Sequence, residues 1–272
     1  MSVSSSAASA EAGLLTIDVS NTETALAFWR GEVAACHWKL GSHPGRTSDE
    51  YRVLIGDLLA REGLAAADVR GCALACVVPE IGPVVDRMCR KLFGRPPFVV
   101  GPGTRTGMDI RADNPRELGA DRIANAVAAR ARFGSPAIVI DFGTAITFDV
   151  VGADGSYTGA VIAPGLDVAA AGLARRASRI GRTEVVAPPN VIADNTEQAL
   201  QSGLVFGFVG LVEGLVARVR DEIGPAPVVV TGDARWLPAV LDATRLSYAH
   251  EPLLTLDGLR RIHGIAAGQT AR

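Results

Sequence analysis

The chain has 272 residues, and at about 150 residues per domain this length indicates roughly two domains. Its 27 Lys and Arg residues nearly balance its 29 Asp and Glu residues, so the net charge is −2 and no basic region of the kind that binds nucleic acid stands out. With 48% hydrophobic and 21% charged residues, the composition is that of a globular protein with a sizeable core and excludes a disordered chain.

Cysteine and lysine usage excludes several kinds of site. The four cysteines form no C-x-x-C pair and have no metal-ligand spacing with the four histidines, so we expect buried, reduced thiols and no structural zinc. Neither Lys39 nor Lys91 follows a glycine loop, as the lysine of a P-loop does. Residues 1–13 lack the basic and apolar regions of a signal peptide, and we interpret them as a flexible leader. No apolar run approaches the roughly 20 residues of a membrane span, so we expect a cytoplasmic protein that does not bind a membrane.

Short apolar runs of strand length alternate with helical patterns along the chain. This alternation predicts an α/β fold in which helices cover mixed sheets. The predicted strands lie at 14–18, 25–29, 71–78, 97–100, 137–141, 148–151, 161–163 and 228–231. The predicted helices lie at 48–62, 80–93, 119–132, 166–178, 195–222 and 255–267.

Residues 15–24 and 139–147 form an internal repeat. Each copy is an apolar strand that ends in an aspartate, which is Asp18 in the first copy and, 123 residues later, Asp141 in the second. A tight turn of small residues and a second β run follow each aspartate, as in a β-hairpin. The repeat predicts two like domains, which we place at 14–133 and 134–272, with the boundary in the Gly-Ser-Pro linker at 134–136.

The two turns have the residues that a phosphate-binding loop needs. Backbone N–H groups and hydroxyls in such a turn point at phosphate oxygens, and the preceding carboxylate can hold Mg²⁺, usually through water. The turn residues are Ser20, Asn21 and Thr22 in the first copy and Gly143 and Thr144 in the second. Taken alone, each turn could be an ordinary hairpin turn, where these residue types are common. As a pair, the turns resemble those of the actin-like ATPase superfamily, in which two such turns clamp a triphosphate.

The segment Gly119-Ala120-Asp121-Arg122 opens the predicted helix 119–132. In the first turn of a helix, Asp121 could be a surface aspartate that favours the helix dipole. Beside a glycine that lets a substrate approach, it could instead be a base that accepts a hydroxyl proton. Arg122 could bind a carboxylate through two parallel hydrogen bonds. A glycine loop at 101–107 follows a strand but has no phosphate-binding spacing of its own.

The predicted helix 195–222 carries glycines at spacings of three and four residues. They are Gly203, Gly207, Gly210 and Gly214. Each costs about 1 kcal/mol relative to alanine in a helix, so we interpret them as a core-facing string that allows close approach of another backbone, such as a partner helix.

An ordered set of motifs resembles the type III pantothenate kinases, which phosphorylate pantothenate with ATP in the first step of coenzyme A biosynthesis. The resemblance runs from Leu14 to about Ile265. Its segments are IDVSNTET, RTSDEY, GPGTRTG, DNPRELGADRIANAVAA, VIDFGTAITFDVV, YTGAVIAPGL, NTEQALQSG and PLLTLDGL. The resemblance implies a two-domain actin-like (ribonuclease H-like) ATPase fold with duplicated βββαβα-type mixed-sheet domains. It also implies a homodimer with its site between the domains, Mg²⁺, and a monovalent cation, K⁺ or NH₄⁺.

The same resemblance assigns roles to individual residues. Asp121 would be the general base, and Asp18 and Asp141 would handle metal and phosphate. The residues that would bind ATP are Asp18, Ser20, Asn21, Thr22, Gly143 and Thr144. The residues that would contact the small-molecule substrate are Gly101, Gly119, Ala120, Arg122 and, from the partner subunit, Thr196.

Several positions depart from the usual family motifs. Ser20 stands where the first turn usually has glycine, and Ala112 stands near the usual position of an aromatic residue. Asp194 replaces a usual lysine, and Asp233 replaces a glycine near the expected nucleotide site. Two alternatives therefore stay open beside pantothenate phosphorylation. One is a diverged kinase for another small hydroxyl substrate, and the other is a non-catalytic regulatory protein that binds nucleotide or metabolite.

Overall fold

The computed structural model of the protein describes residues 13–176, 186–232 and 236–268. Residues 1–12 of the predicted leader and Asp233 therefore lie outside the described part of the chain. The chain forms two compact units: unit 1 contains the residues up to Thr104 and those from Leu259 onward, and unit 2 contains Arg105–Gly258. Each unit holds one five-stranded sheet, so the α/β prediction is confirmed.

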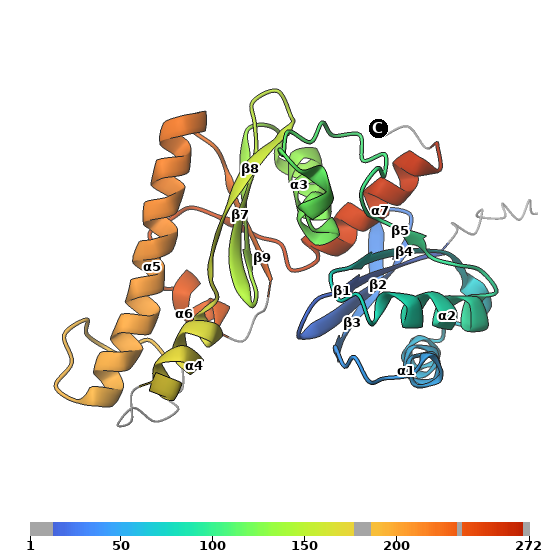
Figure 1. The fold of residues 1–272 in the computed structure, drawn as a ribbon, viewed down its shortest axis with the longest axis horizontal. Helices are drawn as coiled ribbons and strands as arrows, with labels where there is room; N and C mark the ends of the chain where they lie inside the picture. The colour runs from blue at the N-terminus through green and yellow to red at the C-terminus, as the bar shows by residue number, and fades with distance from the viewer. Residues whose placement is uncertain (1–12, 177–185, 233–235, 269–272) are drawn as a thin grey trace, which may run out of the picture. The chain divides into compact units, whose positions relative to one another are not determined.

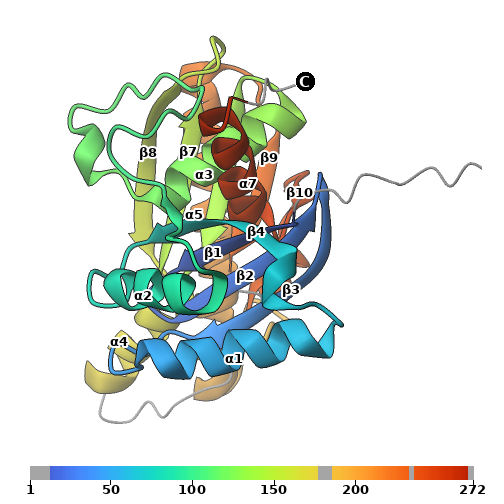
Figure 2. The ribbon, with the colours of Figure 1, turned by 90° about the vertical axis from the view of Figure 1, so that its right-hand side faces the viewer.

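Unit 1 is a mixed sheet covered by two helices that lie side by side on one face (Figure 2). Its strands are β1 (Gly13–Val19), β2 (Glu23–Arg30), β3 (Val33–Gly41), β4 (Val69–Cys76) and β5 (Phe98–Val99), and its helices are α1 (Ser48–Arg61) and α2 (Gly82–Phe93). The strand order is β3-β2-β1-β4-β5, with β1 antiparallel to β2 and parallel to β4. Thr47 and Glu50 form a capping box that begins α1, as the sequence pattern of this motif predicts.

Unit 2 repeats the strand topology of this sheet, but helices pack on both faces of its own sheet (Figure 1). Its strands are β6 (Ala137–Phe142), β7 (Ala145–Val151), β8 (Tyr157–Pro164), β9 (Val228–Gly232) and β10 (Ala249–His250). Its helices are α3 (Ala120–Phe133), α4 (Leu166–Arg176), α5 (Thr196–Ile223), α6 (Leu237–Leu241) and the beginning of α7 (Leu254–Ala266), which ends in unit 1.

The strand order of the second sheet confirms the internal repeat. Read from β8, the order is β8-β7-β6-β9-β10, which matches β3-β2-β1-β4-β5 position by position. β6 takes the place of β1, since it is antiparallel to β7 and parallel to β9. Asp18 and Asp141 therefore occupy equivalent positions near the ends of equivalent strands.

Successive residues of β6 and β7 face opposite sides of the sheet, as the pleat requires. The β6 residues Ile138 and Ile140 belong to the apolar core that α5 completes, whereas Val139 packs with α3 residues. The same alternation in β7 buries Phe148 in the α5 core and turns Asp149 toward α3. One face of the sheet is thus apolar, and the other carries the aspartates.

The compact units divide the chain at other places than the boundary predicted at 134–136. Helix α3 lies before that boundary in the sequence, but it packs on β6 and β7 and belongs to unit 2. The Gly-Ser-Pro signal at 134–136 lies in the short connection between α3 and β6.

The interpretation of the α5 glycines as core-facing is wrong. Gly203, Gly207 and Gly210 are exposed, and a Cβ on any of them would meet nothing within 4 Å. The core side of α5 is formed by other residues, among them Leu204 and Phe208. The spacing of three and four residues correctly places these glycines on one helix face, but it does not show whether that face packs against the core.

Helix α5 is long and apolar enough to cross a membrane when only length and composition are considered. About a third of its most apolar window, 33%, is buried within the chain. One such helix is weak evidence for a membrane span, because core helices pass the same test. Its buried side chains complete the core of unit 2, so we interpret it as a core helix with an uncovered face.

The contact between α7 and α3 gives a first prediction. A Cβ on Gly258 would overlap the backbone of Ala124, so Gly258→Ala must push the two helices apart. We expect a loss of about 1–3 kcal/mol in the free energy of unfolding, measured by urea denaturation.

The control is Gly56→Ala in α1, where the new Cβ would have only one ordinary contact, 3.9 Å from Leu92. The control should unfold at an equal or higher urea concentration than the wild type, since alanine is favoured in helices. Equal stability of Gly258→Ala and wild type would contradict the close packing.

Candidate functional site

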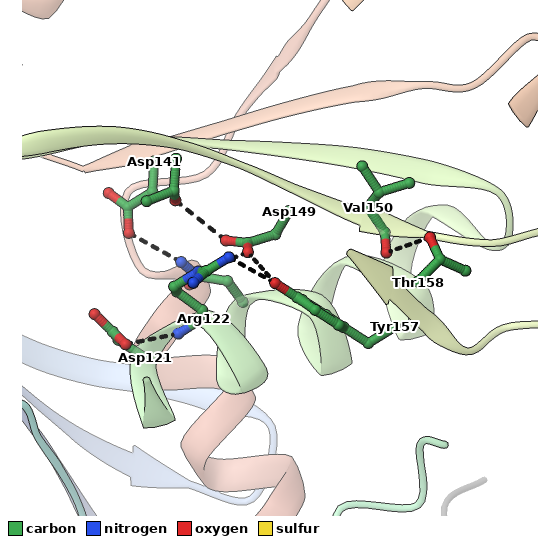
Figure 3. A network of polar contacts seen from close by, with 9 residues as sticks. Asp121, Arg122, Asp141, Asp149, Val150, Tyr157 and Thr158 are labelled. Carbon is green, nitrogen blue, oxygen red and sulfur yellow. Dashed lines mark hydrogen bonds and ion pairs between the residues drawn. The ribbon is translucent and has the colours of Figure 1, made fainter. Parts of the chain in front are cut away.

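A polar network joins the first turn of α3 to β7 and β8 in unit 2 (Figure 3). Arg122 donates from Nε to Asp149 Oδ1 over 2.8 Å and from Nη2 to the Tyr157 hydroxyl over 2.7 Å. The Tyr157 hydroxyl in turn donates to Asp149 Oδ1 over 2.7 Å. Thr147 donates to the other carboxylate oxygen of Asp149 over 3.1 Å. The guanidinium, the carboxylate and the phenol thus form a closed triangle.

The buried position of Asp149 explains why the triangle is closed. The residue is fully buried, and burial raises its pKa, although the Arg122 guanidinium opposes the shift. Burial also raises the pKa of Tyr157, so its hydroxyl stays a hydrogen-bond donor. A buried charge without a partner is strongly destabilising, and here each polar group satisfies another.

Asp121 lies next to this triangle in the first turn of α3. The backbone N–H of Arg122 donates to Asp121 Oδ1 over 2.9 Å (Figure 3). Burial raises the pKa of Asp121, while this hydrogen bond and the Arg122 charge partly oppose the shift. A carboxylate with a raised pKa is a stronger base than an exposed aspartate. Asp121 is half-buried, so the sequence alternative of a freely solvated surface aspartate does not fit.

A chain of hydrogen bonds orients Asp141. The amide of Asn125 donates to Asp141 Oδ2 over 3.0 Å, and the Thr255 hydroxyl donates to Asn125 Oδ1 over 2.7 Å. Asn125 is fully buried in α3, and Thr255 lies at the beginning of α7. The carboxylate at the end of β6 is therefore held from two helices.

Close-packed backbone surrounds the turn after Asp141. A Cβ on Gly232 would lie 2.6 Å from Asp141 Oδ1, and a Cβ on Gly165 would lie 2.5 Å from the carbonyl oxygen of Thr144. Neither position has room for a side chain, so the Gly232 backbone packs against Asp141 and Phe142 and the Gly165 backbone packs against the Gly143-Thr144 turn.

The oxygen donors at the Asp141 turn are of the type that a hard cation binds. Carboxylate and carbonyl oxygens are the ligands that Mg²⁺ and similar cations prefer. Within the ranges that the structure describes, no three His, Cys, Asp or Glu side chains gather into a metal-binding group. A cation at Asp141 or at Asp18 would therefore take further oxygens from backbone, water or a bound phosphate.

The equivalent turn of unit 1 is built around Asp18. Its side chain is almost fully buried, and the Ser20 hydroxyl donates to Asp18 Oδ2 over 3.3 Å. The backbone N–H of Ser20 donates to the Glu23 carbonyl over 2.9 Å and closes the turn. Among the described residues, only glycines have positive φ, so Ser20 takes the place of the usual glycine without backbone strain. The side chains of Asn21 and Thr22 are exposed at the tip of the turn.

The remaining predicted site residues belong to several elements. Gly101 follows β5 in unit 1, where its N–H donates to the Thr104 hydroxyl over 2.9 Å. Gly119 and Ala120 begin α3 next to Asp121, and Thr196 is the exposed first residue of α5. Unit 2 therefore contains Asp121 and Arg122 together with Gly119 and Ala120. Gly101 and the Asp18 turn belong to unit 1.

Two departures from the usual motifs can be placed in unit 2. Ala112 is half-buried, and Asp194 is exposed, with the Asn195 amide 3.1 Å from its carboxylate.

Four residues of the candidate site were not predicted from the sequence. They are Asn125, Asp149, Tyr157 and Thr255. The signal for Asp149 was present, because a charge in the apolar run of β7 must find a partner once it is buried. No local pattern points to the other three, since their partners lie far away in the sequence.

Comparison with known sequences points to one family. The family model described as Type III pantothenate kinase matches residues 14–218. A type III pantothenate kinase of Syntrophotalea carbinolica is 46% identical over 251 residues, which cover 92% of this chain and 98% of the relative. Type III pantothenate kinase 2 of Symbiobacterium thermophilum is 47% identical over 254 residues, covering 92% of this chain and 96% of the relative.

Comparison with solved structures confirms the actin-like fold. A Campylobacter jejuni protein assigned to the Baf family of transcriptional activators has a TM-score of 0.58 at 17% identity and covers 93% of this chain and 99% of its own. Component A of the (R)-2-hydroxyglutaryl-CoA dehydratase of Acidaminococcus fermentans has a TM-score of 0.51 at 16% identity and covers 94% of this chain and 99% of its own. At these identities the likeness concerns the fold alone.

The raised pKa of Asp121 gives a prediction about stability. A carboxyl whose pKa is raised by folding contributes stability below its unfolded pKa, and this contribution is lost as the pH rises through the folded pKa. At pH 7 the ionised Asp121 therefore opposes folding, and Asp121→Asn should raise Tm, with a difference that shrinks toward pH 3.

The matched control is the exposed Asp154, whose pKa is lowered by hydrogen bonds from Ser156. Asp154→Asn should lower Tm at pH 7 or leave it unchanged. Thermal unfolding followed by circular dichroism measures both variants, and a lower Tm for Asp121→Asn at pH 7 would contradict the assigned shift.

Proposed function

Because the chain belongs to the type III pantothenate kinase family and thus phosphorylates pantothenate with ATP in coenzyme A biosynthesis, we propose that Asp121 is the general base of this reaction. The observation that supports the proposal is the half-buried Asp121 carboxylate with a raised pKa, which accepts a hydrogen bond from the backbone N–H of Arg122. Pantothenate carries a hydroxyl at one end and a carboxylate at the other. A base and a guanidinium are the two groups that such a substrate requires.

In the proposed mechanism, Arg122 binds the carboxylate of pantothenate and Asp121 accepts the proton of its primary hydroxyl. The hydroxyl oxygen attacks the γ-phosphorus in line, the bond between the γ-phosphorus and the bridging oxygen breaks, and ADP leaves. Phosphoryl transfer passes through a loose transition state, so positioning and charge neutralisation matter more than covalent help. Gly119 and Ala120 lie next to the base and would leave room for the substrate.

We assign the two aspartate turns to the nucleotide. The backbone N–H groups and hydroxyls of Ser20, Asn21 and Thr22, and those of the Gly143-Thr144 turn, would bind ATP phosphates. Asp18 and Asp141 would hold Mg²⁺ and a monovalent cation, K⁺ or NH₄⁺, which fit the oxygen donors described above. The divalent cation would supply neutralising charge at the β- and γ-phosphate oxygens.

A first experiment measures ADP release with ATP, Mg²⁺, K⁺ and pantothenate. Asp121→Asn should lower kcat by about 10²- to 10⁴-fold, the usual contribution of a general base. Asp154→Asn is the control, because this exposed aspartate lies outside the proposed site, and it should keep wild-type turnover. Wild-type protein without pantothenate-dependent turnover would contradict the function and favour another hydroxyl substrate or a regulatory protein.

The pH dependence of the same assay tests the base. Only the ionised Asp121 can accept a proton, so kcat/KM should fall as the pH drops through its pKa. Because burial raises that pKa, this acidic limb should lie above the ordinary aspartate range near 3.9. A kcat/KM that stays constant down to pH 4 would contradict the assignment.

We also propose that the protein is a cytoplasmic homodimer joined through α5. Gly203, Gly207 and Gly210 lie on an exposed face of a helix whose most apolar window is only 33% buried. Nearby in unit 2, Ile192 has 90% of its surface exposed. Thr196 begins the same helix, which supports its assignment to the substrate of the partner subunit.

Sedimentation velocity tests the dimer. Gly207→Arg places a long charged side chain on the exposed face, where it fits the isolated chain but not a close helix contact. We expect this variant to sediment as a monomer and the wild type as a dimer. Val53→Arg on α1, another exposed apolar position, is the control and should sediment as the wild type does. Dimeric Gly207→Arg protein would contradict the proposed interface.

A further inference from the structure

Tyr157 connects three parts of unit 2. Its side chain is almost fully buried, and its hydroxyl bonds to Arg122 of α3 and to Asp149 of β7 (Figure 3). Its backbone binds the segment before α3: the Tyr157 N–H donates to the Asp109 carbonyl over 2.8 Å, and the Arg111 N–H donates to the Tyr157 carbonyl over 2.9 Å. One residue therefore holds both the guanidinium and the segment that leads to Ala112.

The triangle uses one edge of the Arg122 guanidinium. Nε and Nη2 donate to Asp149 and Tyr157, whereas Nη1 makes no hydrogen bond within the described ranges. A guanidinium is planar, so its Nη1 and the second N–H of Nη2 form another edge that points away from Asp149. That edge has the geometry that binds a carboxylate through two parallel hydrogen bonds.

Taking the proposed function as the premise, we propose that Tyr157 and Asp149 are positioning residues that hold Arg122 with this free edge toward the carboxylate of pantothenate. The two residues order the long arginine side chain before the substrate arrives, and the fully buried Asp149 balances its charge. Because the Tyr157 backbone also binds residues 109–111, the same residue aligns the neighbouring segment with the guanidinium.

Tyr157→Phe isolates the role of the hydroxyl. The variant keeps the ring and the backbone hydrogen bonds, and Asp149 keeps its bonds from Arg122 and Thr147. Hydrogen bonds to charged groups are stronger than those between neutral groups. We therefore expect the loss of the bond between the Tyr157 hydroxyl and Arg122 to raise KM for pantothenate about 10-fold or more. KM for ATP, kcat at saturating pantothenate and Tm should change little.

Thr158→Val is the matched control on the next residue of β8. Among the residues that the structure describes, the Thr158 hydroxyl bonds to the Val150 carbonyl alone, over 3.2 Å and outside the triangle (Figure 3). This variant should keep the wild-type KM for pantothenate. A similar rise in KM for both variants would show a general disturbance of the hairpin and would overturn the proposal.

A double-mutant cycle shows whether Tyr157 acts through Arg122. Values of kcat/KM for pantothenate are compared for wild type, Tyr157→Phe, Arg122→Lys and the double variant. If Tyr157 positions the guanidinium, its hydroxyl should matter about 10-fold with Arg122 present and less than about 2-fold with lysine in its place. The same fold-loss in both backgrounds would overturn the proposal.

The outcomes separate this inference from the function on which it rests. Wild-type protein without pantothenate-dependent turnover overturns both. Wild-type protein that turns over pantothenate, with Tyr157→Phe at an unchanged KM, overturns only the positioning role.

Discussion

A buried ion pair between Arg122 and Asp149 is the constraint on which the polar side of unit 2 depends. The carboxylate is fully buried, and leaving one member of such a pair without its partner costs about 3–5 kcal/mol. Because Arg122 lies in the first turn of α3 and Asp149 in β7, the pair fixes that turn against the sheet. Asp121 precedes Arg122 in the chain and is fixed with it. Through Tyr157 the same constraint reaches the segment at 109–111.

The strand pleat explains why the chain can combine this polar cluster with a stable core. In β6 and β7, alternate residues pack against α5 and form an apolar core, while the residues between them face α3. Unit 1 follows the same rule, since Leu15, Ile17 and Val19 belong to its apolar core and Asp18 lies between two of them in the strand. The duplicated topology therefore places an aspartate near the end of the first strand of each sheet, directly before a tight turn.

Long apolar patterns and the repeat predicted most of the fold, because strands such as β1 and β6 are buried along almost their whole length. No range was predicted for strand β3, because its residues alternate between exposed and half-buried and His37 and Lys39 interrupt its apolar residues. The site was predicted only in part: Asp18, Asp121, Arg122 and Asp141 have local motifs, whereas Asp149, Tyr157 and Asn125 act through partners that are distant in the sequence. The prediction that the α5 glycines face the core was wrong for a related reason. The spacing of residues along a helix defines one helix face, but it does not show which element packs on that face.

The most direct test of this account is a crystal structure of the protein with pantothenate and a non-hydrolysable ATP analogue. The account predicts two hydrogen bonds from the Nη1 and Nη2 edge of Arg122 to the pantothenate carboxylate, with the Asp149 and Tyr157 contacts unchanged. It also predicts the primary hydroxyl within about 3 Å of the Asp121 carboxylate, the distance that proton transfer to a base requires. A carboxylate bound away from Arg122, or a hydroxyl out of reach of Asp121, would contradict the central claim.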